Sequence, residues 1–176
     1  MIAFGGVICG LAIAVLFLSG LLPMLDYTLP AISGILLISM VIEYGYKSAV
    51  LCYAAVAVLS LLLVPNKEVA LLFAGFFGFY PILKGKLEQL KKRPLEWLLK
   101  FLIFNAAMLV FVLAASWFLG IEQVLGELGA LGYWAFLILF VLGNAAFLLF
   151  DCLLTRLIGM YYSYFKPKFL DKLNLH

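Results

Sequence analysis

Residues 29–63 read LPAISGILLISMVIEYGYKSAVLCYAAVAVLSLLL, two long apolar runs separated by the short polar segment EYGYKS. The rest of the chain is built in the same way: 67% of its residues are hydrophobic, only 12% are charged, and its mean hydropathy is +1.19. Soluble domains carry about 25% charged residues. A chain this poor in charge cannot cover a water-facing surface, so the sequence predicts a membrane protein.

Hydropathy divides the chain into six apolar segments. Each is expected to form a helix, because membrane strands need alternating residues and a closed barrel. We therefore expect an all-α polytopic membrane protein, a six-transmembrane-helix bundle in a single domain over residues 1–176. The second and fourth segments have only about 15 residues, whereas about 20 are needed to cross the hydrocarbon core, so a re-entrant arrangement of these two is the alternative. The expected helices are 3–22, 29–43, 48–64, 69–83, 95–120 and 130–160.

The basic residues indicate how these helices are oriented, because Lys and Arg near helix ends are retained on the cytoplasmic side. With six crossings and both termini cytoplasmic, all of the 12 basic residues except Lys67 lie inside. The expected location is therefore the cell membrane, as a multi-pass protein of the bacterial inner-membrane type. The most basic segment, residues 84–97 (KGKLEQLKKRPLEW), is interpreted as an ordinary topology-setting loop, or as a strip that lies on anionic lipid or docks a partner.

Several classes of protein are excluded by what the sequence lacks. The only histidine is His176, so neither a catalytic triad nor a histidine-containing metal site is available. Cys9, Cys52 and Cys152 lie in separate apolar runs without the spacing of metal ligands. There is no glycine-rich phosphate loop, and the basic residues are explained by topology rather than by nucleic acid. We therefore expect no enzyme activity, no metal, no cofactor and no nucleic-acid partner.

Three polar side chains fall deep within apolar segments, Asn105, Asn144 and Asp151. An ionised group at such depth costs on the order of several kcal/mol unless it is paired, so it usually faces the interior of a bundle. Asn144 and Asp151 are seven residues apart, which places them on nearly the same, inward face of a helix. Asp151 is interpreted as a structural polar residue that holds helices together, or alternatively as a proton or cation site. Each asparagine amide is expected either to bond a neighbouring helix or to contact a solute.

The first apolar segment carries small residues at four-residue spacing, Gly6, Gly10 and Ala14. Small residues at this spacing let another helix approach closely, which favours association where helices gain no hydrophobic energy from each other. These three residues are the candidate partner-docking surface. The partner helix belongs either to this chain or to a second protein.

With these features, the chain resembles the substrate-binding S component of energy-coupling factor (ECF) vitamin transporters. The resemblance covers most of the chain. It rests on the six short helices, on the small-residue stripe in GGVICGLAIA (5–14), and on residues 29–63, where a helix ends at the aromatic-Gly-x-Lys turn of residues 44–47. The segments FFGFYPILK (76–84) and FDCLLTRLIGMYY (150–162) also resemble uncharacterised membrane proteins of Gram-positive bacteria that have the same plan.

The resemblance implies a binding protein for a small solute such as a vitamin, with no ATPase of its own. Its first helix would dock on the transmembrane T subunit of an ECF module, whose ATPases would topple it to release the solute inside. The family's site lies toward the outer half of the membrane, against the fourth to sixth helices. By position, this selects as substrate-binding residues Asn105, Asn144, Ser116, Trp117, Tyr133 and Trp134.

Two other functions are compatible with the sequence. The alternative is a structural or scaffold protein of the bacterial cell envelope without transport activity, comparable in plan with the rod-shape-determining membrane proteins. A packing role for Asp151 fits this alternative equally well. A third interpretation is a small enzyme or flippase that acts on lipid, which has only the basic inner strip in its favour.

Overall fold

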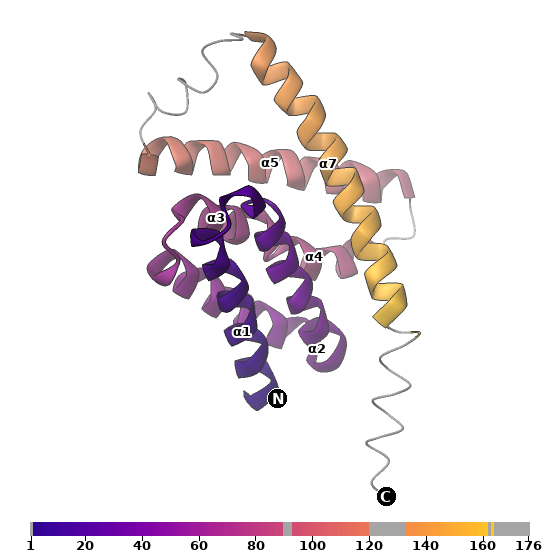
Figure 1. Cartoon of the computed structure of the whole chain (residues 1–176). Coiled ribbons are helices and arrows are strands. Elements are labelled where there is room, and N and C mark those ends of the chain that lie inside the picture. Colours follow the sequence, from indigo (N-terminus) through magenta and orange to yellow (C-terminus); the bar gives the residue numbers. More distant parts are fainter. Residues whose placement is uncertain (1, 90–92, 120–132, 162, 164–176) are drawn as a thin grey trace, which may run out of the picture. The chain divides into compact units, whose positions relative to one another are not determined.

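The computed structural model describes residues 2–89, 93–119, 133–161 and 163. These residues are 92% helical and include no strand, which confirms the expected all-α class for this part of the chain. The chain divides into two compact units, residues 1–132 and 133–176, and each is described by itself. The main helices, labelled in Figure 1, are α1 (Ile2–Phe17), α2 (Thr28–Leu63), α3 (Lys67–Leu72), α4 (Tyr80–Leu87), α5 (Arg93–Leu119) and α7 (Tyr133–Met160).

Five helical segments among the described residues are long and apolar enough to cross a membrane. The sequence predicts six, and the difference arises in α2, whose 36 residues count as one segment although its backbone breaks at Gly45, between the two expected helices 29–43 and 48–64. The five segments are Ile2–Gly20, Thr28–Leu63, Lys67–Leu87, Arg93–Ala114 and Leu137–Met160.

The backbone of α2 leaves the helical conformation at Gly45, where φ is 80° and ψ is 176°. We call residues 28–44 the first arm and residues 46–63 the second arm. Ser33 of the first arm donates a hydrogen bond from its hydroxyl to the carbonyl oxygen of Ala12 at 3.1 Å. Further along the same arm, Met40 lies beside Gly5. Because residue numbers rise along the arm as they fall along α1, the first arm is antiparallel to α1.

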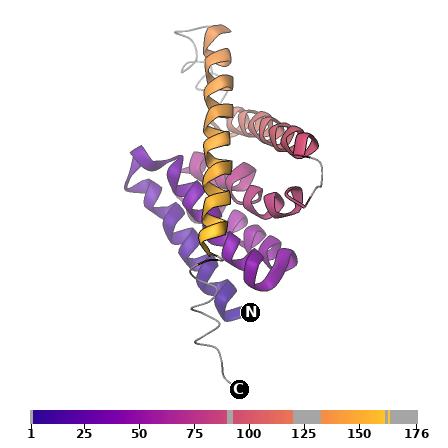
Figure 2. The ribbon, with the colours of Figure 1, turned by 90° about the vertical axis from the view of Figure 1, so that its right-hand side faces the viewer.

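The second arm runs parallel to α1. The thiol of Cys9 contacts the carbonyl oxygen of Cys52 at 3.8 Å, and Gly20, just beyond α1, lies beside Pro65, just beyond the second arm. Residue numbers therefore rise together along α1 and the second arm. The two arms are antiparallel to each other, so α2 folds back at the turn around Gly45. Figures 1 and 2 show both arms packed beside α1.

Local sequence explains where α2 ends and α3 begins. Pro65 follows the last turn of α2, and the ammonium of Lys67 donates to the carbonyl oxygens of Leu61 and Val64 at 2.9 and 3.0 Å. A cation at the C-terminal end of a helix satisfies carbonyls that have no partner within the helix. Asn66 then caps α3, since its side-chain oxygen accepts from the backbone N–H groups at positions 68 and 69.

The fourth apolar segment continues from α3 through a π-helix, η3 (Phe73–Phe77), into α4. It is longer than expected, because helical structure extends to Leu87 instead of ending at residue 83. Pro81 has no N–H to donate to the carbonyl of Phe77, four residues earlier, and this loosens the helix at that turn. The backbone of Gly34 in the first arm lies directly against the same carbonyl.

The core of the first unit lies between α1, the two arms of α2 and the α3–η3–α4 segment. Aromatic rings extend this core to α5, because Phe76 stacks on Tyr80 with ring centroids 4.9 Å apart and meets Phe104 of α5 edge-on at 5.2 Å. The buried hydrophobic cluster consists of Ile8, Ala12, Leu16, Leu37, Met40, Ala49, Val56, Ala57, Val64, Val69, Ala70, Phe73 and Ile82.

Candidate functional site

The two predicted asparagines lie on different units, Asn105 on α5 and Asn144 on α7. Each side-chain amide donates a hydrogen bond to the backbone carbonyl one turn earlier in its own helix, to Phe101 and to Phe140 respectively, both at 2.8 Å. Each amide can donate two hydrogen bonds and accept two. One donor of each asparagine is therefore used within its own helix.

The other four predicted binding residues lie at the ends of the same helices. Ser116 and Trp117 belong to the last turn of α5, and Tyr133 and Trp134 to the first turn of α7. The indoles of Trp117 and Trp134 are 81% and 68% exposed, as expected for aromatic anchors at a membrane interface. The side chains of Ser116 and Tyr133 lie outside the described part of the structure. A solute pocket formed by all six residues remains a prediction.

Asp151 is buried on α7. Its backbone carbonyl accepts a hydrogen bond from the hydroxyl of Thr155 at 3.0 Å. Bonds of this kind, from a Thr side chain back to the preceding turn, occur within helices and often bend them. Its assignment as a structural polar residue remains a prediction.

The small-residue stripe Gly6, Gly10 and Ala14 lies on the exposed face of α1. A Cβ atom added at Gly6 or at Gly10 would have no neighbour within 4 Å among the described residues. The opposite face of α1 packs on α2 through Gly5, Ile8, Ala12 and Leu16, which are buried. The stripe is therefore not used for packing within the described part of the first unit.

A cluster of four charged side chains joins α4 to α5, and sequence reasoning missed it. Lys84 is completely buried and pairs with Glu88 at 2.8 Å. Lys100 is also buried, pairs with Glu96 at 2.8 Å, and lies 3.6 Å from the same oxygen of Glu88. Glu88 thus links both lysines. The signal in the sequence was the i,i+4 spacing of each close pair, which favours such ion pairs on a helix.

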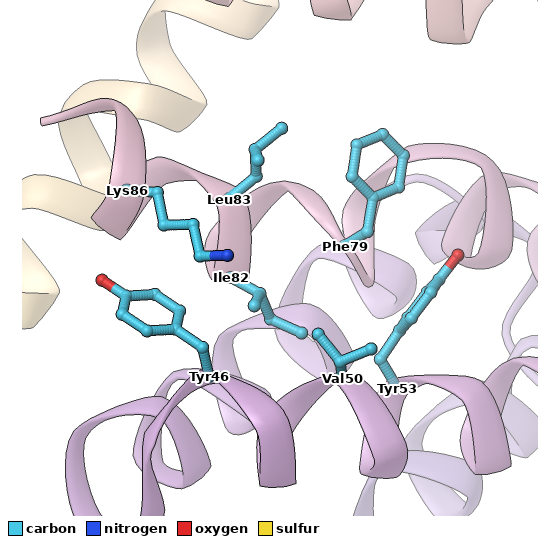
Figure 3. Close-up of a pocket in the computed structure, with 7 residues that line it drawn as sticks. All are labelled: Tyr46, Val50, Tyr53, Phe79, Ile82, Leu83 and Lys86. Atoms are coloured by element: carbon cyan, nitrogen blue, oxygen red, sulfur yellow. The ribbon is translucent and has the colours of Figure 1, made fainter. Parts of the chain in front are cut away.

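A groove separates the second arm of α2 from α4 (Figure 3). Its volume is about 190 Å³. At one end the ammonium of Lys86 lies 5.3 Å from the ring centroid of Tyr46, and at the other end lie the rings of Tyr53 and Phe79. Tyr46, Val50 and Tyr53 are spaced so that they lie on one face of α2. The sequence alone does not predict a groove there, because it does not show which helix packs beside that face. The groove is lined by Tyr46, Val50, Tyr53, Phe79, Ile82, Leu83 and Lys86.

Comparison of the chain with protein-family models, with curated proteins and with solved structures finds no match.

Proposed function

We propose that the chain crosses the membrane six times, with both termini in the cytoplasm. A straight helix with the 36 residues of α2 would be about 54 Å long at 1.5 Å per residue, far more than a hydrocarbon core of about 30 Å. Folded back at Gly45, its arms are each about 26 Å long and match that thickness. Counting the two arms separately turns five apolar segments into six.

This topology also fits the distribution of charge. The turn at Gly45 carries Lys47, and the end of α4 carries Lys84 and Lys86, so the positive-inside rule favours a cytoplasmic position for both. Lys67, the one basic residue left outside, has a structural role, because it caps the C-terminal end of α2.

Within this topology we propose that the protein is the substrate-binding subunit of an ECF-type uptake transporter for a small solute such as a vitamin. The fold-back of α2 carries the proposal, since it supplies the six-helix plan of the S components that the sequence resembles. The exposed stripe of Gly6, Gly10 and Ala14 gives additional support, because it leaves one face of α1 open to a T subunit. The protein itself would be neither an enzyme nor dependent on a cofactor.

The solute site is proposed at the six predicted residues of α5 and α7. Asn105 and Asn144 supply polar amide groups, and the exposed indoles of Trp117 and Trp134 offer flat apolar surfaces. Pockets for small solutes combine a few polar groups with aromatic surfaces.

Co-purification and ligand binding together test this function. The tagged chain, expressed with an ECF module, is expected to retain the T subunit and the ATPases. Small molecules that remain bound through purification are identified by mass spectrometry and then added back. A solute present at 100 times its dissociation constant is expected to add about 2.7 kcal/mol to the free energy of unfolding. Absence of both the module and any stabilising solute would contradict the proposal.

A scaffold protein of the cell envelope is the second candidate, and the ion-pair cluster favours it. Lys84, Glu88, Glu96 and Lys100 hold α4 to α5, so this polar cluster serves helix packing. A scaffold is expected to co-purify with other envelope proteins and to show no melting shift with any solute.

A further inference from the structure

We propose that the groove between the second arm of α2 and α4 binds one anionic membrane lipid. The phosphate lies at Lys86 and Tyr46, and an acyl chain extends toward Tyr53 and Phe79. This site is distinct from the solute site on α5 and α7, and lipid binding there does not depend on a transport function.

The polar end of the groove offers an exposed cation that has no counter-ion among the described residues. Lys84, two residues earlier on α4, pairs with Glu88, whereas Lys86 forms no salt bridge with any described residue. Beside it, the hydroxyl oxygen of Tyr46 accepts a hydrogen bond from Gln89 at 3.3 Å, and its proton is not donated to any described residue. An ammonium and a phenol at one end of a groove provide the charge and the donors that bind a phosphate.

The other end of the groove is apolar. The hydroxyl of Tyr53 donates to the carbonyl oxygen of Ala74 at 2.5 Å, so the polar atom of this residue is already satisfied. Between the two ends lie Val50, which is 50% exposed, and Ile82, which is buried (Figure 3). Tyr46 and Tyr53 are seven residues, about 10 Å, apart along the arm. The groove therefore changes from polar to apolar over about 10 Å. This is about the distance from the headgroup of a lipid to the upper part of its acyl chain.

The size of the groove favours a lipid over an enclosed solute. Pockets that enclose drug-sized ligands have volumes of about 300–1,000 Å³. The groove has about 190 Å³, and the half-exposed Val50 leaves it open at the side. A single acyl chain fits such an open groove while the rest of the lipid remains in the bilayer.

The polar end of the groove lies beside the Gly45 turn, which also carries Lys47. In the orientation proposed above this end faces the cytoplasm, where anionic lipid headgroups attract basic residues. Only the assignment of the leaflet rests on that orientation.

The test is to measure lipid retention by the full chain on its own. The protein is purified from an equal mixture of phosphatidylglycerol and phosphatidylcholine, and the bound lipid is counted by native mass spectrometry. The wild type is expected to prefer phosphatidylglycerol.

Lys86→Gln is expected to lower this preference about fivefold, the contribution of one cation beside an anionic surface. Lys86→Arg is expected to preserve it. Lys47→Gln, which removes an exposed cation at the same end but outside the groove, is expected to have no effect.

A second pair of variants tests the apolar end. Val50→Trp fills the groove and is expected to lower retention of phosphatidylglycerol. Val58→Trp, at a similarly exposed position of the same arm outside the groove, is expected to leave retention unchanged. The proposal is overturned if Lys86→Gln binds as the wild type does, if Lys47→Gln loses as much as Lys86→Gln, or if Val50→Trp has no effect. No ECF module is present in this assay, so its failure is separate from failure of the transport function.

Discussion

Gly34 of the first arm lies against the backbone carbonyl of Phe77 in η3, so closely that a Cβ atom at position 34 would clash with the carbonyl oxygen. Backbone cannot move aside as the end of a flexible side chain can. The first arm and η3 would have to separate to admit even a methyl group. Gly34→Ala is therefore expected to lower the free energy of unfolding by at least about 2 kcal/mol, within the range known for overpacked cores. Thermal unfolding of the purified protein in detergent measures this loss.

Gly6→Ala is the matched control for this variant. Gly6 is also a helical glycine, but an added Cβ would meet nothing within 4 Å among the described residues. Alanine is favoured over glycine in helices by about 1 kcal/mol, so Gly6→Ala is expected to be neutral or slightly stabilising. Equal stability of the two variants would show that Gly34 and Phe77 are not in close contact.

The turn of α2 depends on the backbone conformation of Gly45. Its φ of 80° with ψ of 176° falls in a region that is essentially restricted to glycine, and other residues pay about 1–3 kcal/mol to adopt it. Outside its two chain neighbours, no atom of the described residues lies within 4 Å of a Cβ built at Gly45, so steric contact adds nothing to this cost. Gly45→Ala is expected to lower the free energy of unfolding by about 1–3 kcal/mol, measured as above.

Gly159→Ala serves as the reference for Gly45→Ala. Gly159 lies in α7, an added Cβ would meet none of the described residues within 4 Å, and its φ is not positive. Its replacement is expected to leave the melting temperature unchanged or to raise it. If Gly45→Ala melts as Gly159→Ala does, α2 does not need the turn that folds its arms back.

Part of this fold could be predicted from the composition of the chain and from its local pattern of apolar and polar residues. The apolar runs gave the all-α class, and the polar segment EYGYKS indicated the interruption that the structure places at Gly45. These features depend only on residues close together in the chain. Hydropathy also identified the apolar part of the fourth segment, but it did not predict that the helix continues through Lys84. The charged residues at the end of this helix give it the composition of a loop.

The features that the sequence did not reveal all depend on contacts between distant segments. Nothing in the composition distinguishes the buried and paired Lys84 from the exposed Lys86, two residues later. Their difference arises because α5 packs on one side of α4 and the second arm of α2 on the other. The close approach at Gly34 likewise requires the π-helix near Pro81, which no hydropathy pattern predicts.

The ion-pair cluster is expected to stabilise the contact of α4 with α5 through Glu88. One oxygen of Glu88 lies 2.8 Å from the ammonium of Lys84 and 3.6 Å from that of Lys100. Glu88→Gln keeps the shape but removes the shared negative charge, so we expect a loss of about 2 kcal/mol in the free energy of unfolding. Lys84→Met provides the second single variant of a double-mutant cycle. Residues in one ion-pair network show coupling of about 0.5–3 kcal/mol. Simple addition of the two losses in the double variant would contradict the network.

The proposed docking face is tested by two leucine substitutions on opposite sides of α1. Gly10→Leu places a large side chain on the exposed face, where nothing lies within 4 Å of an added Cβ among the described residues. It is expected to preserve the melting temperature and to abolish co-purification with an ECF module. Gly5→Leu is the control, because its Cβ would already lie 3.4 Å from the sulfur of Cys52, and it is expected to lower the melting temperature. Undiminished co-purification of Gly10→Leu would refute the docking role.

The membrane topology is tested at the two ends of the second arm. Lys47 follows the Gly45 turn and Lys67 is bonded to the last carbonyls of α2, so nearly the whole second arm, about 25 Å of helix, separates them. The three native cysteines are replaced by alanine, and Lys47→Cys and Lys67→Cys are then made separately. A membrane-impermeant maleimide added to intact cells is expected to label position 67 but not position 47, and to label both after the membrane is made permeable. Labelling of both positions in intact cells would mean that the arm does not cross the bilayer. Labelling of position 47 alone would reverse the orientation and place the cationic end of the lipid groove outside.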